Sequence, residues 1–388
     1  MNLYLMHTDV IVAELTLMGG YMHIIRIINN DHMPLGVKDV SPDLMDQRLA
    51  RWLEERCIPK TQPNYKMLLS KAGVSSITEM PTKSYMCAIT DCYWFKSIHD
   101  KASWSDVNFF ANGFDETAGK VTLKGDNMVE ITDWNFPELT TNGCLPKRWF
   151  QGPNGEFYLL KAGTPPDYKE VYNEAFAYQC AMLFGLDAVP YAVYHDAENG
   201  LDYSICPSFI QSDREEFISL EQIRISLGGS KQAALDYLYQ IGLGDYVEAI
   251  RGFDYLIRNT DRHFGNIGVI RDSSTLQIKR LAPLFDHGFS MDIPPVTEKH
   301  GAYLQKLTEK TGNEELTDLK KLGWTLTSEI TPADIMRRAR ETYQDLYTRP
   351  DLMRLTNDIG RRLYDLQQHA EALQNEEHLF HTYRGGNE

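Results

Sequence analysis

Two short runs in the second half of the chain decide its predicted fold: Asp261-Arg262-His263-Phe264-Gly265-Asn266 and Leu284-Phe285-Asp286-His287-Gly288. The first run places the amide of Asn266 five residues after the acid Asp261, and the second carries another acid, Asp286, two residues before a glycine. Phosphoryl transfer requires a group that orients the acceptor hydroxyl and hard oxygen ligands for Mg²⁺. The two runs therefore predict an ATP-dependent kinase in which Asp261 orients the acceptor while Asn266 and Asp286 bind Mg²⁺.

The segments around these runs predict how the acids come together. An apolar stripe of helical spacing over residues 246–257 leads into the first run, so Asp261 is expected on a loop just beyond a helix. Residues 267–270 and 276–281 are expected to pair as a hairpin that brings Asp286 back beside the first run. An acid and an amide at this spacing are a weak pattern alone, and the hairpin is what gives the pattern weight.

A lysine and a glutamate upstream are candidates for holding the nucleotide. Lys161 ends the expected strand 157–161, and Glu174 lies on the expected helix 168–184. In a kinase such a pair holds the lysine against the α- and β-phosphates of ATP. The alternative is an ordinary surface lysine and glutamate. The downstream runs favour the nucleotide role.

Two connecting segments are candidates for contacting the rest of ATP. Residues 140–147 precede the first strand of the expected nucleotide-binding lobe, where Gly143 permits close backbone approach to phosphates and Lys147 adds positive charge. A simple turn explains this segment equally well. Residues 206–210, which include Phe209, lie where a hinge between two lobes is expected, and backbone groups there would hydrogen-bond adenine.

The basic side chains within the runs have two interpretations. Arg262 and His263 follow Asp261 and are counted with it as candidate catalytic residues; Arg262 would pair with Asp286 or a phosphate, or brace the loop. His263 and His287 flank the two acids, and histidine together with such oxygen ligands can bind transition metals. No thiolate and no H-x-x-x-H spacing supports a metal site here, so structural histidines are the favoured interpretation.

Chain length and the pattern of expected elements predict three parts. Residues 1–130 form a small α+β module of unknown role that opens with a hairpin around Gly19-Gly20, and the polar segment 115–127 connects it to the next domain. Residues 135–210 form a β-rich nucleotide-binding small lobe, and residues 211–388 form a helical catalytic lobe. The predicted fold class is α+β, with a two-lobed protein-kinase-like fold behind the N-terminal module.

Charge and cysteine usage limit the cofactors, partners and location. The 39 basic and 54 acidic residues give a formal charge of −15, which disfavours a sequence-independent grip on nucleic acid. The six cysteines form no C-x-x-C pair, so neither a disulfide framework nor a zinc knuckle is indicated. The apolar stretch 10–28 is interrupted by Glu14 and Arg26 and has no cleavage site. We expect a cytoplasmic protein without a membrane segment that uses ATP and Mg²⁺.

Several of these residues together resemble the HipA-type serine/threonine kinases of bacteria: Lys161, Asn173-Glu174, residues 259–266 and residues 281–286. The resemblance covers roughly residues 138–360, and it is fairly specific because its D-x-H-x-x-N and apolar-Pro-apolar-apolar-Asp elements occur in order. It implies transfer of the γ-phosphoryl group of ATP to Ser or Thr hydroxyls of a protein. It also implies a toxin of a toxin–antitoxin system, with an antitoxin-like partner.

The resemblance also implies a role for each matched residue. By analogy with the family, Asp261 is the catalytic base, Asn266 and Asp286 are the Mg²⁺ ligands, and Lys161 is the nucleotide lysine. Residues 143–147 correspond to the phosphate loop.

Three features depart from the family. Arg262 stands where the family usually has a small residue, and together with Asp286-His287-Gly288 it is also reminiscent of phosphatidylinositol kinases. The family's loop often bears an autophosphorylated serine, whereas this chain offers Thr140 and Thr141 as acceptors within itself. Residues 1–130 do not obviously match the usual N-terminal subdomain, although they resemble the leading segment of other HipA-like proteins.

Two further functions stay open. One is a non-catalytic nucleotide-binding regulator that acts through the N-terminal module on an antitoxin-like or DNA-binding partner. The other is a kinase for a lipid or small-molecule hydroxyl. The net negative charge and the lack of a basic amphipathic helix disfavour activity at an anionic membrane. This argument does not apply to a small soluble acceptor.

Overall fold

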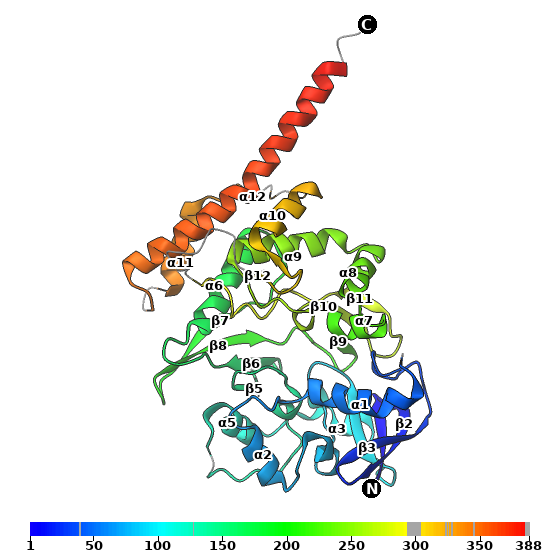
Figure 1. Ribbon diagram of the computed structural model, residues 1–388. Helices are drawn as coiled ribbons and strands as arrows, with labels where there is room; N and C mark the ends of the chain where they lie inside the picture. The colour runs from blue at the N-terminus through cyan, green and yellow to red at the C-terminus, as the bar shows by residue number, and fades with distance from the viewer. Residues whose placement is uncertain are drawn as a thin grey trace. The chain divides into compact units, whose positions relative to one another are not determined.

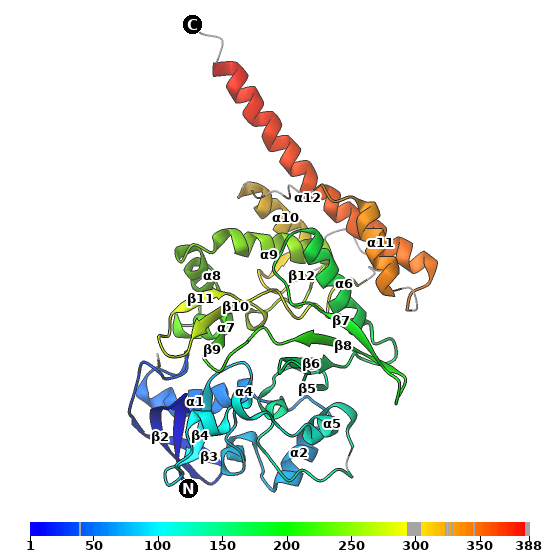
Figure 2. The ribbon, with the colours of Figure 1, turned by 180° about the vertical axis from the view of Figure 1, so that it is seen from behind.

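The structure is a computed structural model that describes residues 1–38, 40–126, 128–292, 304–322, 324, 326, 329–343 and 346–384, with side chains up to residue 367. The chain divides into two compact units, whose elements are labelled in Figure 1 and seen from behind in Figure 2. Unit 1 comprises Met1–Thr164, Tyr194–Ala234 and Ile267–Pro283, and unit 2 comprises Pro165–Val193, Leu235–Asn266 and Leu284–Glu388. Unit 1 therefore holds the predicted N-terminal module together with much of the predicted small lobe.

Unit 1 begins with an antiparallel sheet of order β3-β2-β1-β4. Its strands are β1 (Asn2–His7), β2 (Val10–Met18), β3 (Tyr21–Ile27) and β4 (Tyr93–Ser97), and the helices α1 (Pro42–Arg56) and α2 (Tyr65–Ala72) follow β3. The expected hairpin is present, with Gly19 and Gly20 both at positive φ in its turn. Side chains alternate along β1, so Leu3 and Leu5 join a core with α1 while Met6 joins a second, tryptophan-containing core.

Short helices connect this sheet to the next one. They are α3 (Trp104–Val107), α4 (Phe109–Asn112), α5 (Thr117–Lys124) and η2 (Pro137–Thr140), while η1 (Ile77–Thr82) precedes β4 within the first sheet. Helix α5 lies within the segment 115–127 that was expected to be a polar connection, and its Ala118 and Val121 are buried in the same core as α1. Most of that segment is therefore packed helix, and Asn127 lies outside the described residues.

The second sheet contains the strands predicted for the small lobe. Its order is β5-β6-β8-β7, with β5 (Lys147–Gln151), β6 (Phe157–Lys161), β7 (Ala192–Asp196) and β8 (Leu201–Pro207). The turn at 152–155 joins β5 to β6 as the sequence predicts, and Gly155 takes a positive φ there. In this register Lys147 lies directly opposite Lys161, so two of the predicted nucleotide residues are cross-strand neighbours.

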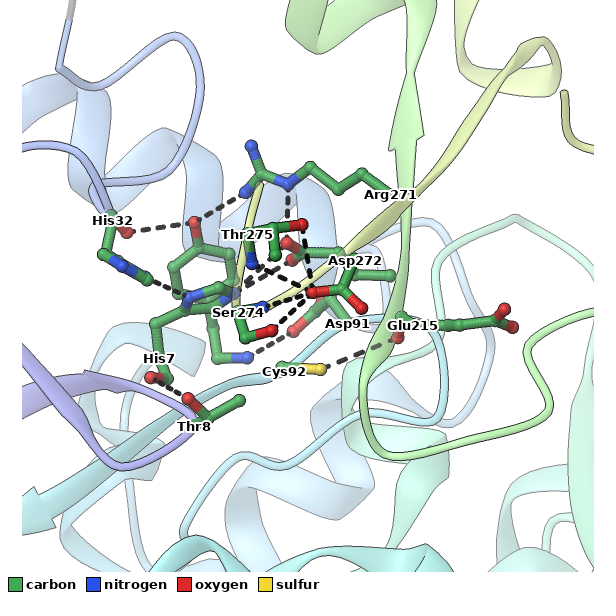
Figure 3. A network of polar contacts seen from close by, with 12 residues as sticks. His7, Thr8, His32, Asp91, Cys92, Glu215, Arg271, Asp272, Ser274 and Thr275 are labelled. Atoms are coloured by element: carbon green, nitrogen blue, oxygen red, sulfur yellow. Dashed lines mark hydrogen bonds and ion pairs between the residues drawn. The ribbon is translucent and has the colours of Figure 1, made fainter. Parts of the chain in front are cut away.

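The third sheet has the order β11-β10-β9 and includes a strand that the sequence did not predict. Strands β10 (Gly268–Asp272) and β11 (Ile278–Leu281) form the expected hairpin, whereas β9 (Glu215–Ser219) lies where a helical pattern was expected and precedes α7 (Leu220–Ser226). Buried Glu216 of β9 accepts from Arg271 of β10 at 2.6 Å and contacts His7 of β1 at 3.2 Å. His7 also contacts His32 at 2.8 Å, and Figure 3 shows this network.

Unit 2 is mainly helical; it includes residues 165–193, which lie outside the predicted catalytic lobe 211–388, and lacks residues 267–283. It contains α6 (Lys169–Leu183), the end of α8 (Lys231–Gln240), α9 (Gly244–Ile257), η3 (Phe264–Asn266), β12 (Leu304–Gln305), β13 (Lys310–Thr311), α10 (Gly312–Lys321), α11 (Pro332–Tyr343) and α12 (Arg349–Arg384). Helix α12 is tied to α9 because Arg362 donates to the carbonyl of Leu256 at 2.7 Å. None of the helices in the described ranges combines the length and apolar composition that crossing a membrane requires.

Candidate active site

The loop that carries Asp261 is ordered by the end of α9. The helix ends at Ile257, and the next residue, Arg258, has a φ of 53° in the left-handed region that turns the chain away from the helix axis. The next residue, Asn259, donates from its side chain to Asp254 at 3.0 Å and accepts the backbone N–H of Asp261 at 3.0 Å. Asp261 therefore sits on a short loop with a rigid helix behind it, as the sequence predicts.

The carboxylate of Asp261 forms an ion pair that the sequence did not reveal. Lys306, in the turn between β12 and β13, donates to Oδ1 of Asp261 at 2.6 Å. The side chains of Lys306 and Asp261 are 53% and 33% exposed, so the pair lies at the surface of unit 2. No sequence pattern points to Lys306, because its link to Asp261 spans 45 residues and depends wholly on the fold.

The structure brings the two candidate metal ligands together. The side-chain amide of Asn266 donates from Nδ2 to Oδ2 of Asp286 at 2.9 Å. Asp286 has a φ of 60°, a left-handed conformation that Asp tolerates better than most residues and that is often found at functional sites. An amide that donates from Nδ2 keeps Oδ1 as its oxygen ligand. One carboxylate and one amide fit Mg²⁺, which usually takes few protein ligands and completes its shell with water and phosphate.

Arg262 is the support on which these loops rest. Its side chain is fully buried, and its guanidinium donates to both carboxylate oxygens of Asp254 on α9, at 3.0 to 3.3 Å. The remaining donor group, Nη1, reaches the carbonyl of Asn266 at 3.2 Å and that of Phe285 at 2.7 Å. One side chain therefore links α9, the end of the first run and the residue before Asp286. The bracing alternative considered for Arg262 is the one that the contacts match.

The two histidines beside the acids make different contacts. The N–H of Gly265 donates to Nδ1 of His263 at 3.0 Å, so the neutral ring carries its proton on Nε2. Burial lowers the pKa of His263 below its ordinary value, which favours this neutral form. His287 is fully buried and lies edge-on to the ring of Phe253 at 5.8 Å.

Helix α6 holds the second run through neighbouring side chains. Oε2 of the fully buried Glu174 accepts the backbone N–H of His287 at 2.7 Å. The side-chain amide of Asn173 donates to the carbonyls of Gly288 and Ser290 at 2.8 and 2.7 Å. The hydroxyl of Tyr343 in α11 donates to Oδ1 of Asn173 at 2.8 Å. Glu174 thus supports the residue after Asp286. Its predicted pairing with Lys161 stays a prediction, because the two residues belong to different units.

In unit 1, the predicted phosphate-loop residues lie together at the start of β5. Gly143 has a φ of +108°, and a Cβ added there would lie 1.9 Å from Nζ of Lys147. Lys147 passes across this glycine and donates to the carbonyl of Asn142. The glycine is therefore needed for both backbone conformation and space. Lys161, opposite Lys147 in the register, is buried at the end of β6.

The remaining candidates of unit 1 are already engaged within the fold. The carbonyl of Phe209 accepts Nη2 of Arg280 at 2.8 Å, and its ring lies edge-on to that of Phe217. Buried Thr140 donates its hydroxyl to the carbonyl of Cys87 at 2.7 Å, and Thr141 donates to that of Pro137 at 2.7 Å. Phosphorylation of the buried Thr140 would require the turn to open.

The antiparallel sheets of unit 1 and the helical unit 2 correspond to a two-lobed kinase-like fold of the α+β class, which confirms the predicted fold class. No family model and no curated protein matches the sequence. The chain is similar in fold to HipA of the Shewanella oneidensis MR-1 toxin–antitoxin system, solved with HipB and operator DNA. That match has a TM-score of 0.56 and 14% identity over 94% of this chain and 96% of that chain.

The structure of a Helicobacter pylori proinflammatory kinase, CtkA, also matches, over 59% of this chain and 95% of that chain. Its TM-score is 0.45 and its identity 16%. The match to the Shewanella HipA shows that the chain is HipA-like in fold, as its sequence motifs suggest.

Proposed function

We propose that the protein is an ATP- and Mg²⁺-dependent kinase that transfers the γ-phosphoryl group to a Ser or Thr hydroxyl of a protein. The observation that carries this proposal is the contact between Asn266 and Asp286, two oxygen-bearing side chains from runs 20 residues apart, behind a loop that presents Asp261. A HipA-like fold supports the same function. The proposed assignments are Asp261 as the base and Asn266 and Asp286 as metal ligands.

The proposed chemistry divides between charge neutralisation and orientation. The acceptor oxygen bonds to the γ-phosphorus as the bond to the ADP oxygen breaks, and the carboxylate of Asp261 takes up or orients the acceptor proton. Mg²⁺ held by Asn266 and Asp286 would neutralise charge on the phosphates. In unit 1, Lys147 and Lys161, which lie opposite each other in the strand register, would add positive charge at the end of one hairpin.

A protein hydroxyl is the proposed acceptor because the two departures that suggest a lipid kinase have internal roles. The guanidinium of Arg262 is bound to Asp254 and to two backbone carbonyls, and it is fully buried. His287 is equally buried and packs on Phe253. Neither side chain contacts solvent, so neither recognises an acceptor headgroup in this arrangement.

The test is phosphoryl transfer from labelled ATP with Mg²⁺, to the protein itself and to candidate acceptor proteins. Asp261→Asn and Asp286→Asn should each lower the rate at least about 100-fold, because each removes an orienting or metal-binding group from the transition state. Asp245→Asn, which changes an acid in the first turn of α9, is the matched control and should keep the rate. Near-normal transfer in either site variant would refute the assignment.

Nucleotide binding can be followed separately through one thiol. Of the six cysteines, Cys144 in the predicted phosphate loop is exposed, while the other five are buried. Burial raises the pKa of Cys57 and of Cys180 to about 12, which makes both thiols unreactive near neutral pH. A thiol reagent should therefore modify Cys144 first in the folded protein. Bound ATP should slow that reaction in the wild type and in the Asp261→Asn variant alike.

The same experiment separates a kinase from a nucleotide-binding regulator. A regulator would show protection of Cys144 by ATP without any transfer, and its biological effect would survive Asp261→Ala. We further propose a partner of the antitoxin kind, because the HipA of similar fold was solved with HipB. Co-purification of a small protein with the full chain, identified by mass spectrometry, tests that proposal. A chain that purifies alone at near-native expression would count against it.

A further inference from the structure

The predicted phosphate loop rests on the N-terminal module. Ile58, just after α1, donates its backbone N–H to the carbonyl of Leu139 in η2 at 3.0 Å. Thr140 donates to the carbonyl of Cys87, and Gln62 reaches the loop itself. The segment that enters the loop and the loop carbonyls are thus both attached to residues 58–87, a part of the chain with no role predicted from its sequence.

Gln62 makes the contacts that bear on the loop conformation. Its amide nitrogen donates to the carbonyl of Gly143 at 2.9 Å and to that of Leu145 at 3.1 Å. An amide NH₂ group has two hydrogens, so both are used on this one loop. The side chain is 5% exposed, and its own backbone N–H is bound to Pro59 at 3.0 Å. Gln62 is therefore a fixed donor that binds two carbonyls of the loop.

The bond from Gln62 to the carbonyl of Gly143 fixes the direction of one peptide. The bond between Gly143 and Cys144 is trans, because the one cis peptide in the described chain joins two prolines. In a trans peptide the carbonyl and the N–H point in opposite directions. With the Gly143 carbonyl held by Gln62, the N–H of Cys144 faces away from the module. A backbone N–H held in one direction beside a lysine is the arrangement that binds phosphate.

We propose that Gln62 is a positioning residue for the phosphates of the nucleotide, and that the N-terminal module is a structural part of the nucleotide site. The inference rests on the proposed function, since it assumes that the Gly143 loop contacts a nucleoside triphosphate. It assigns residues 58–87 a role that neither the motifs nor the comparisons supply. Gln62 itself touches no reacting atom, so it acts through the loop.

A positioning role predicts a specific kinetic signature. Loss of Gln62 should weaken ATP binding by about tenfold, because two hydrogen bonds that hold the loop are lost and the loop must order on binding. Groups that act on the transferred phosphoryl lie elsewhere, so kcat should stay within about twofold. A residue needed only for folding would lower the amount of active enzyme without a selective rise in KM for ATP.

The experiment compares Gln62→Met with a matched control two residues away. Met has a similar length but no donor, and the milder Gln62→Asn keeps a donor on a shorter side chain. In the control, Asn64→Leu removes a bond of the same type, from Nδ2 to the carbonyl of Thr122 in α5 at 2.7 Å, that has no loop residue as its direct partner. KM for ATP, kcat and the rate of Cys144 modification without nucleotide are measured for each full-length variant.

The inference expects Gln62→Met to raise KM and to speed Cys144 modification, Gln62→Asn to give intermediate values, and Asn64→Leu to change neither. An unchanged KM and thiol rate in Gln62→Met would overturn it, and so would a fall in kcat at constant KM. The two proposals fail differently. If the wild type transfers no phosphoryl group from ATP, the proposed function is refuted; if it does, and the same ATP concentration half-protects Cys144 in wild type and Gln62→Met, only the role of Gln62 is refuted.

Discussion

A buried carboxyl group at the entrance to the phosphate loop should make the stability of unit 1 depend on pH. Glu138 in η2 is 3% exposed, and its Oε1 accepts the backbone N–H of Trp149 in β5 at 2.7 Å. It thus joins the element before the loop to the strand after it. Burial raises the pKa of Glu138 from 4.5 to about 7, because the desolvated carboxylate lacks the hydration of an exposed one.

The size and sign of the effect follow from this pKa. A carboxyl whose pKa is higher in the folded state binds more protons when folded, so its contribution to stability is complete below about pH 4.5 and is lost as pH rises to about 7. Each pH unit of this interval lowers the free energy of unfolding by about 1.4 kcal/mol, so the whole interval lowers it by about 3 kcal/mol. Glu138→Gln keeps an oxygen acceptor for Trp149 but has no proton to lose. The variant should therefore become progressively more stable than the wild type as pH rises.

Urea unfolding between about pH 5 and pH 8, followed by tryptophan fluorescence, measures this difference. Five of the six tryptophans lie in unit 1 and report on the region that contains Glu138: Trp52, Trp94, Trp104, Trp134 and Trp149. Subtracting wild type from variant at each pH removes the titration of all other groups. A difference that stays constant across the range would refute the buried-carboxylate argument, and a difference that falls with pH would reverse its sign.

Three other changes test the remaining contacts. Arg262→Met should lower the free energy of unfolding by about 3 to 5 kcal/mol and abolish transfer, whereas adding Asp254→Leu should restore stability in urea without restoring activity. Glu216→Gln should cost about as much as Arg262→Met in the same assay, because it leaves the guanidinium of Arg271 buried without its counter-charge. Lys306→Met should change stability by less than about 1 kcal/mol, since its pair is half exposed, yet lower the initial rate of transfer about tenfold.

The elements that sequence predicted best have strong local patterns. The hairpin around Gly19-Gly20 requires two residues at positive φ, and both glycines supply it. Helix α6 ends at Leu183, with Gly185 left-handed just beyond it. Strand β9 has no such pattern, because Glu215 and Glu216 break the apolar alternation. Its stability as a strand comes from distant partners, notably Arg271 on β10, which no local window contains.

The candidate site divides in the same way. The meeting of Asn266 and Asp286 was predictable because a single hairpin connects them and its turn residues are recognisable. Lys306 and Gln62 were not, since their contacts lie 45 and 81 residues away along the chain. Neither residue belongs to a motif, and lysine and glutamine are common surface residues. Long-range contacts of this kind become visible only when the fold is known.

The role of Arg262 bears most directly on the acceptor class. In the sequence, the arginine between Asp261 and His263 makes the run reminiscent of phosphatidylinositol kinases. In the fold the same guanidinium is bound to Asp254 and to the carbonyls of Asn266 and Phe285, with no exposed surface. A buried arginine bound in this way fixes the distance between the two runs, and it has no donor directed at solvent with which to bind an acceptor. The arginine therefore distinguishes this chain from the family pattern by how it holds the proposed metal ligands, and if the proposed function is correct, the choice of acceptor must be made by residues outside the two runs.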